Sequence, residues 1–278
     1  MNVRARRLSP FSLAALSSTL VISVLWAGLI LEGVRVEHTP IAKIAAAEES
    51  APPAIVHEYI EVIGGCGPHY EGGPCVTTHA GPGEDYRILS RLRKGLVLEV
   101  EPVANNLQVW YKVVFNEPVR YPERVAGSPY VSEGPNVRHF YGDGVEEWNG
   151  AVSTSKRILV DRSRQRLYAY EGDALFMETS ISTGLDITPT PRGTFRVYKK
   201  TSTRYMQGPL PGVSDQYYDL PGVPWNLYFT PEGGVIHGAY WHEGFGRKWS
   251  HGCVNVPLKE AEELYAWAEL GMEVMVVE

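Results

Sequence analysis

The second half of the chain contains short segments in which apolar and polar positions alternate, separated by polar turns. Alternation with period two is typical of strands that have one face buried. It predicts strands over 157–161, 166–170, 175–182 and 194–199. Because the turns between these segments are short, we expect the strands to pair antiparallel.

The last part of the chain changes to a helical pattern. Leu258, Ala261, Leu264 and Ala268 have the spacing of one apolar helix face, which predicts a helix over 257–270. Pro257 suits the first helical position, and Gly271 suits the stop. The apolar segment 272–277 predicts a closing strand.

A long apolar run lies near the N-terminus. Residues 11–31 carry no charge and follow Arg4, Arg6 and Arg7, and a helix of this length would span about 31 Å. We therefore expect a transmembrane signal anchor within residues 1–36, with the remainder on the outer side of the cytoplasmic membrane. A cleaved signal peptide is the alternative. Residues 37–54 have neither period and are interpreted as a tether.

Residues 55–120 are interpreted as a small β module, because short apolar runs alternate there with Gly and Pro turns. Cys66 and Cys75 lie in such a turn-rich stretch, and an oxidising compartment would let them form a disulfide. Half of a zinc site, or two free thiols, are the alternatives. Residues 121–154 are interpreted as a linker or an extension of the module.

Parts of this module resemble bacterial SH3-like domains. The resemblance rests on the turn at Gly81-Pro82, the turn at Lys94-Gly95 and the strand Trp110-Tyr111-Lys112-Val113. It implies a small β-barrel that contacts wall peptides or glycan, with a spacer barrel that binds nothing as the alternative. His79 stands where these domains usually carry Arg.

Composition narrows the class of protein. The 278 residues are 44% hydrophobic and 21% charged, which suits one large or two small folded domains and excludes a disordered acidic tail. The net charge of −6 provides no basic face, so nucleic acid is not an expected partner. Three cysteines are too few for a disulfide-dense miniprotein.

Residues 201–229 are rich in Tyr, Trp and Pro, and we interpret them as a long loop. Such a loop is either a lid over an active site or an aromatic surface segment packed on the sheet. Trp225 and Tyr228 are its candidate substrate-binding residues.

The candidate chemistry lies in Val235-Ile236-His237-Gly238 and in Ser250-His251-Gly252-Cys253-Val254-Asn255. His237 follows two apolar residues, as at the end of a buried strand, and an imidazole there can accept the proton of a thiol. Three interpretations compete on residue types alone. They are a Cys253 nucleophile with a His base, a buried structural Cys, and a zinc site of His237, His242, His251 and Cys253.

These two strings resemble the signature of the L,D-transpeptidase (YkuD-type) catalytic domain. Further matches are the strands at 158–161 and 167–170, the turn Ser182-Thr183-Gly184 and the segment 190–195. The resemblance covers residues 155–278 and implies a mainly β, sandwich-like catalytic domain with a C-terminal helix. It selects the nucleophile interpretation over the zinc site.

The resemblance implies a role for each matching residue. Cys253 would be the nucleophile and His237 its base, while His251, Gly252 and backbone N–H groups would shape the loop and oxyanion hole. Ser250 would help to orient the histidines. Asn255 would hold the loop or a substrate carboxylate, and the carbonyl of Gly238 would orient His237.

The implied reaction is a two-step acyl transfer on peptidoglycan at the cell wall. A donor tetrapeptide stem would acylate Cys253 and release D-Ala, and the amine of a second stem would then form a 3→3 cross-link. The resemblance implies no metal and no organic cofactor. Water as acceptor would make the protein a carboxypeptidase, and a non-catalytic cell-wall-binding protein is the remaining alternative.

Overall fold

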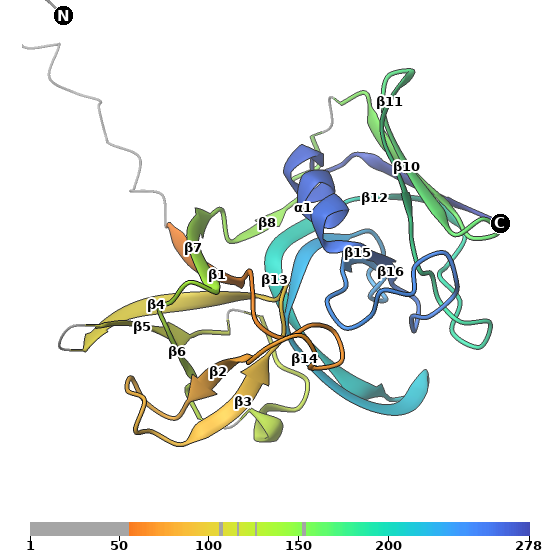
Figure 1. Cartoon of the computed structure of the whole chain (residues 1–278). Helices are drawn as coiled ribbons and strands as arrows, with labels where there is room; N and C mark the ends of the chain where they lie inside the picture. The colour runs from red at the N-terminus through yellow and green to blue at the C-terminus, as the bar shows by residue number, and fades with distance from the viewer. Residues whose placement is uncertain (1–55, 106–107, 116, 126, 152–153) are drawn as a thin grey trace, which may run out of the picture. The chain divides into compact units, whose positions relative to one another are not determined.

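The computed structural model describes residues 56–105, 108–115, 117–125, 127–151 and 154–278. The expected anchor and tether, residues 1–54, lie outside the described residues. Within the described ranges, no helix has the length and apolar character needed to cross a membrane. These ranges form three sheets and one α-helix, so the chain is mainly β (Figure 1).

The N-terminal sheet contains seven strands in an open order, and its two edge strands are not paired with each other. The expected closed barrel is therefore wrong. The barrel does not close because β7 pairs along the whole of β1, from His57↔Gly142 to Val62↔Val137. Strand β7 thereby occupies the edge of β1 that closure would need. In spatial order the strands are β3 (Ile88–Leu92), β2 (Val76–His79), β6 (Tyr130–Ser132), β5 (Gln108–Val113), β4 (Val97–Asn105), β1 (His57–Val62) and β7 (Val137–Gly142).

Cys66 and Cys75 are joined by a disulfide in the connection between β1 and β2, with their Cα atoms 4.6 Å apart. Cys66 is fully buried. Residues 121–151 contribute a short 3-10 turn, η1 (Pro122–Arg124), and the strands β6, β7 and β8 (Val145–Glu147). This stretch therefore contains regular strands that complete two different sheets.

The second sheet has the order β11-β10-β9-β17-β12. Its strands are β9 (Lys156–Asp161), β10 (Arg166–Glu171), β11 (Ala174–Ser180), β12 (Gly193–Arg196) and β17 (Glu273–Val277). The hairpin pairs are antiparallel as expected, whereas the closing strand β17, whose direction the sequence left open, runs parallel to β9. Strands so far apart in sequence are not joined by a hairpin, and no turn fixes their relative direction.

The third sheet has the order β16-β15-β14-β13-β8. Its core is a hairpin of β13 (Lys199–Leu210) and β14 (Ser214–Tyr228), while β15 (Val235–Gly238) and β16 (Val254–Val256) continue it. The interpretation of residues 201–229 as a loop is wrong. The ladder shifts register between Arg204 and Met206 and again between Gly208 and Leu210, and such irregularities accommodate prolines within a strand.

The helix α1 (Leu258–Trp267) is shorter than the predicted 257–270, and Pro257 is its N-cap rather than its first helical residue. Its buried residues Ala261 and Leu264 join the core between the second and third sheets. The N-terminal sheet shares a second core with the hairpin, because Val223 on β14 is buried in one cluster with Ile60 and Leu98. The hairpin is therefore held on both sides, which fixes the strands that carry the candidate site.

Candidate active site

The strands β15 and β16 lie side by side and run parallel (Figure 1). Ile236 pairs with Val254 and His237 pairs with Asn255. Cys253 directly precedes β16, so the backbone places it beside the strand that carries His237. The fold thus brings together the two segments that the sequence singled out.

His237 is completely buried. Its Nδ1 lies 3.0 Å from the backbone oxygen of Gly238, and a carbonyl oxygen only accepts, so Nδ1 carries the proton and donates. Nε2 is then an acceptor, and it has no hydrogen-bond partner among the described residues. Burial lowers the pKa of His237 to about 3, which keeps the imidazole neutral at physiological pH.

Cys253 is the free cysteine of the described chain, and it is half-buried. Its Sγ donates to the carbonyl oxygen of Gly233 at 3.8 Å rather than to His237. Burial raises the pKa of the Cys253 thiol, and the nearby charge of Arg204 opposes that rise. The resting pair is therefore a neutral thiol beside a neutral imidazole, and such pairs often close only when substrate binds.

The loop before Cys253 is held by its own first residue. Ser250 Oγ donates to the carbonyl oxygen of Cys253 at 2.5 Å and accepts from the N–H of Gly252 at 3.1 Å. Both bonds go to the loop backbone and neither reaches a histidine ring, so the role of Ser250 in orienting the histidines stays a prediction. Gly252 has φ of 122°, a conformation that strongly favours glycine. His251 stacks on Tyr218 of β14, with ring centroids 5.8 Å apart.

Thr190, in the segment that follows the turn Ser182-Thr183-Gly184, contacts the backbone of this loop. Thr190 Oγ1 donates to the carbonyl oxygen of Cys253 at 3.4 Å and accepts from the N–H of Gly184 at 2.9 Å. A Cβ on Gly184 would lie 2.2 Å from the carbonyl oxygen of Thr188, so only glycine allows this contact. Gly184 and Thr190 thus support the Cys253 loop through these hydrogen bonds.

Asn255 is buried and holds the loop rather than facing a substrate. Its backbone N–H and carbonyl both bond Ser182 at 2.9 Å, and its side-chain amide lies 2.9 Å from Nε2 of His242. Burial lowers the pKa of His242 to about 4. Among the described residues, no three His, Cys, Asp or Glu side chains gather in a way that would hold a metal ion.

The two aromatic candidates lie elsewhere. Trp225 is wrongly predicted to bind substrate: it is buried in the core between Phe140 and Tyr265, at centroid distances of 5.8 and 5.4 Å. Tyr228 is also buried, and its hydroxyl donates to Glu117 at 2.9 Å. An aromatic residue on a strand has the same sequence pattern whether it faces a groove or the core.

The sequence analysis missed two residues of this region. Tyr218 stacks on His251, and burial together with the charge of Cys253 raises its pKa to about 12. The aromatic richness of residues 201–229 was the signal for it. Arg204, whose charge acts on both Cys253 and His237, had no sequence signal, because it lies in a stretch of mixed polar residues.

Comparison with known proteins agrees with the motif. Residues 155–276 match the family model of the L,D-transpeptidase (YkuD) catalytic domain. No curated protein matches the chain.

Three solved structures are similar to parts of the chain. A transpeptidase–avibactam carbamoyl enzyme is 30% identical over 45% of this chain and 49% of its own, with a TM-score of 0.41. A mutant L,D-transpeptidase of Enterococcus faecium is 29% identical over 44% and 50%, with a TM-score of 0.40. An L,D-transpeptidase of Mycobacterium smegmatis is 18% identical over 64% and 99%, with a TM-score of 0.42. The chain spans about half the length of the first of these.

Proposed function

We propose, from the L,D-transpeptidase catalytic domain that residues 155–276 form, that this protein joins peptidoglycan stem peptides through a thioester on Cys253. The proposal rests on the pairing of two parallel strands, because β15 carries His237 and Cys253 directly precedes β16. The half-buried thiol of Cys253 lies beside the strand of His237, whose neutral Nε2 is free to accept a proton.

In the first step the thiol of Cys253 passes its proton to Nε2 of His237, and the sulfur attacks the carbonyl before the terminal D-Ala of a donor tetrapeptide. The tetrahedral intermediate collapses, the C–N bond breaks, and His237 returns the proton to the leaving amine. The bond from Nδ1 of His237 to the Gly238 oxygen keeps the acceptor nitrogen oriented throughout. A general base of this kind contributes about 10²- to 10⁴-fold.

In the second step the side-chain amine of another stem attacks the thioester. His237 takes the proton of this amine and gives it to the departing sulfur of Cys253, which leaves a 3→3 cross-link and the free enzyme. Backbone N–H groups around Gly252 and Cys253 would stabilise the oxyanion in both steps, with an effect of about 10²- to 10³-fold. The positive φ of Gly252 favours such an arrangement of the backbone.

Water as the acceptor gives a carboxypeptidase on the same site. This second candidate is favoured by the partial exposure of Cys253, because an acyl group on a half-exposed sulfur is within reach of solvent. Both activities place the protein at the cell wall, and attachment to the cytoplasmic membrane through residues 11–31 belongs to the same proposal.

The test is incubation of the purified protein with a disaccharide-tetrapeptide, followed by mass analysis of the products. We expect a cross-linked dimer with loss of D-Ala, or a tripeptide if water is the acceptor. Intact-mass measurement should show one covalent adduct with a carbapenem-type acylating agent. Active protein that gives no adduct would argue against the thioester.

Replacement of the thiol is the most direct check. Cys253→Ala should reduce cross-linking by at least about 10⁴-fold, because the step that forms the covalent intermediate is lost. Its circular dichroism and thermal midpoint should match those of the wild type. Ser214→Ala, at the first residue of β14, serves as a matched control and should retain activity. Cross-linking that survives in Cys253→Ala would refute the assignment.

A further inference from the structure

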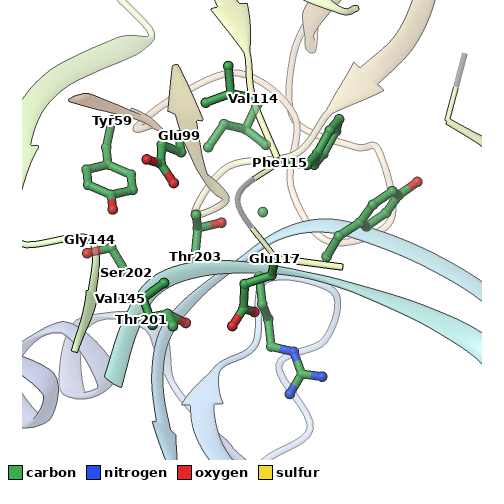
Figure 2. Close-up of a pocket in the computed structure, with 14 residues that line it drawn as sticks. Tyr59, Glu99, Val114, Phe115, Glu117, Gly144, Val145, Thr201, Ser202 and Thr203 are labelled. Atoms are coloured by element: carbon green, nitrogen blue, oxygen red, sulfur yellow. The ribbon is translucent and has the colours of Figure 1, made fainter. Parts of the chain in front are cut away.

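Within the described chain, two neighbouring cavities lie between the N-terminal sheet and the β13–β14 hairpin, and Phe115 and Tyr205 line both of them. The smaller one has a volume of about 30 Å³, which holds about one water molecule (Figure 2). The larger one, which we call the arginine cavity, has a volume of about 240 Å³ and is lined by Arg91, Arg93 and Arg124. A cavity of about 150 Å³ is enough for benzene, so the arginine cavity has room for an organic group.

The arginine cavity extends from the surface toward the core. Among its lining residues, Tyr70 and Arg91 are exposed, whereas Leu92 and Tyr240 are buried. Further aliphatic lining comes from Leu89, Leu96, Leu98 and Val113. A ligand can therefore enter from solvent and bury an apolar portion against these side chains.

The charge of the arginine cavity is positive, although the whole chain has a net charge of −6. Asp219 is the acidic residue among those that line it. It lies 3.7 Å from Arg124 and accepts a hydrogen bond from Gln207 at 2.8 Å, so its carboxylate already has partners. Arg91 and Arg93 form no ion pair with any described residue. Two guanidinium groups therefore remain without a counter-ion in the same cavity.

The first of these groups, on Arg93, is held in place by its surroundings. Its Cζ lies 5.1 Å from the ring centroid of Tyr70 and 4.8 Å from that of Tyr240. Its Nη1 donates to the carbonyl oxygen of Pro68 at 3.1 Å, and a guanidinium has five N–H donors, so others remain for a ligand. The side chain of Arg91 makes no hydrogen bond, ion pair or ring contact with a described residue.

We propose that the arginine cavity binds a short acidic peptide, whose side-chain carboxylate bonds to Arg91 and Arg93. A carboxylate matches the planar donors of a guanidinium and accepts parallel N–H bonds from it. The aliphatic and aromatic lining covers the methylene groups of the same side chain, which an inorganic anion lacks. Neither Cys253 nor His237 lines the cavity, so this second site goes beyond the proposed function.

Binding of defined peptides to the purified full-length protein tests the inference without any turnover. The probes are N-acetyl-Glu-Ala-amide and N-acetyl-Gln-Ala-amide, which differ only in the side-chain carboxylate. NMR titration should give a dissociation constant at least about 10-fold lower for the acidic peptide, because hydrogen bonds to a charged group are the stronger ones. Added salt should weaken the binding of the acidic peptide and not that of the neutral one.

Arg91→Met is the informative variant, because Arg91 has no side-chain partner among the described residues whose loss would disturb the fold. It should weaken binding of the acidic peptide by about 10-fold and keep the thermal midpoint of the wild type. Arg87→Met is the matched control, since Arg87 is an exposed arginine in the β2–β3 connection that does not line the cavity. It should bind the acidic peptide as the wild type does. Equal affinities of Arg91→Met and wild type would overturn the inference.

Three further results would also overturn it. The first is equal binding of the two peptides to the wild type. The second is inorganic phosphate that binds as tightly as the acidic peptide and displaces it, because the cavity would then accept any small anion. The third is loss of peptide binding once Cys253 has been alkylated with iodoacetamide, because the peptide would then occupy the catalytic site. If no stem peptide is turned over but the acidic peptide still binds, the proposed function fails while the arginine cavity stands.

Discussion

At the scale of single residues, the site depends on a histidine that burial keeps neutral. His237 has Nδ1 fixed by its own neighbour Gly238, and this bond leaves one nitrogen as an acceptor. The same burial makes His237 a liability in acid, because a proton taken from solvent leaves an uncompensated charge in the interior of the folded protein.

This liability predicts an acid-sensitive fold. The pKa of His237 is about 3 in the folded protein and 6.5 when exposed, so below pH 6.5 the unfolded chain binds a proton that the folded chain does not. Stability from this group is complete above pH 6.5 and is lost as pH falls, by about 1.4 kcal/mol per unit. His242, with its pKa lowered to about 4, adds to the loss in the same direction.

The measurement is the free energy of urea unfolding between pH 7 and pH 4. Wild type should lose stability steeply over this window, and His237→Asn should show a slope that is smaller by about 1.4 kcal/mol per unit. Ser214→Ala, which changes no titratable group, is the control and should retain the wild-type slope. Equal slopes in wild type and His237→Asn would contradict the assignment.

At the scale of elements, the β13–β14 hairpin decides which aromatic residues face the site. Tyr218 reaches His251, whereas Trp225 lies in the core against β7 and α1. Two shifts of register and a left-handed φ of 61° at Trp225 set these directions. A single shift of one residue exchanges the two faces of a strand, so these details could not be read from the sequence.

The different surroundings of Trp225 and Tyr218 predict that replacing them has different effects on stability. Trp225→Ala should lower the free energy of unfolding by about 3–5 kcal/mol, because it empties a buried aromatic site. Tyr218→Phe keeps the ring that stacks on His251, and it should change the stability by less than about 1 kcal/mol. Denaturant titration of both variants is the measurement. A stable Trp225→Ala with impaired substrate binding would restore the first interpretation of Trp225.

At the scale of the whole molecule, the N-terminal sheet is part of the support of the catalytic domain. Val223 and Tyr240 share a buried cluster with strands β1 and β4, and Gly222 approaches Val97 so closely that a Cβ would lie 2.6 Å from its carbonyl oxygen. The segment before η1 also contacts the hairpin, because the N–H of Tyr121 donates to Gln207 at 2.7 Å. The hairpin is thus clamped by residues that precede position 155.

The disulfide should contribute to this support. It closes a short loop, for which the chain-entropy model gives about 2.5 kcal/mol. Replacing both Cys66 and Cys75 by Ser should therefore lower the unfolding free energy by about that amount while alkylation of Cys253 proceeds at the wild-type rate. Cys253→Ser, with the disulfide intact, is the control. Unchanged stability of the double variant would show that the closed loop is not what holds the β1–β2 connection.

Much of the secondary structure could be predicted where its signal is local. The hairpins β9–β10 and β10–β11 follow from alternation and short turns. The helix α1 follows from its apolar stripe, although its ends differ by one to three residues from the prediction. The hairpin β13–β14 could not be predicted, because its prolines and aromatic residues have the composition of a loop. Its strands exist because both faces are covered by other sheets.

The sequence by itself indicated the class of chemistry that we propose, since the spacing of His237 and Ser250 to Asn255 is local information and residues 155–276 match the L,D-transpeptidase (YkuD) family model. Only the tertiary structure decided how these groups are arranged. The parallel pairing of β15 with β16 joins residues that no turn connects, and burial set the neutral state of His237. Charge and burial depend on neighbours from distant parts of the chain, and a local pattern does not contain them.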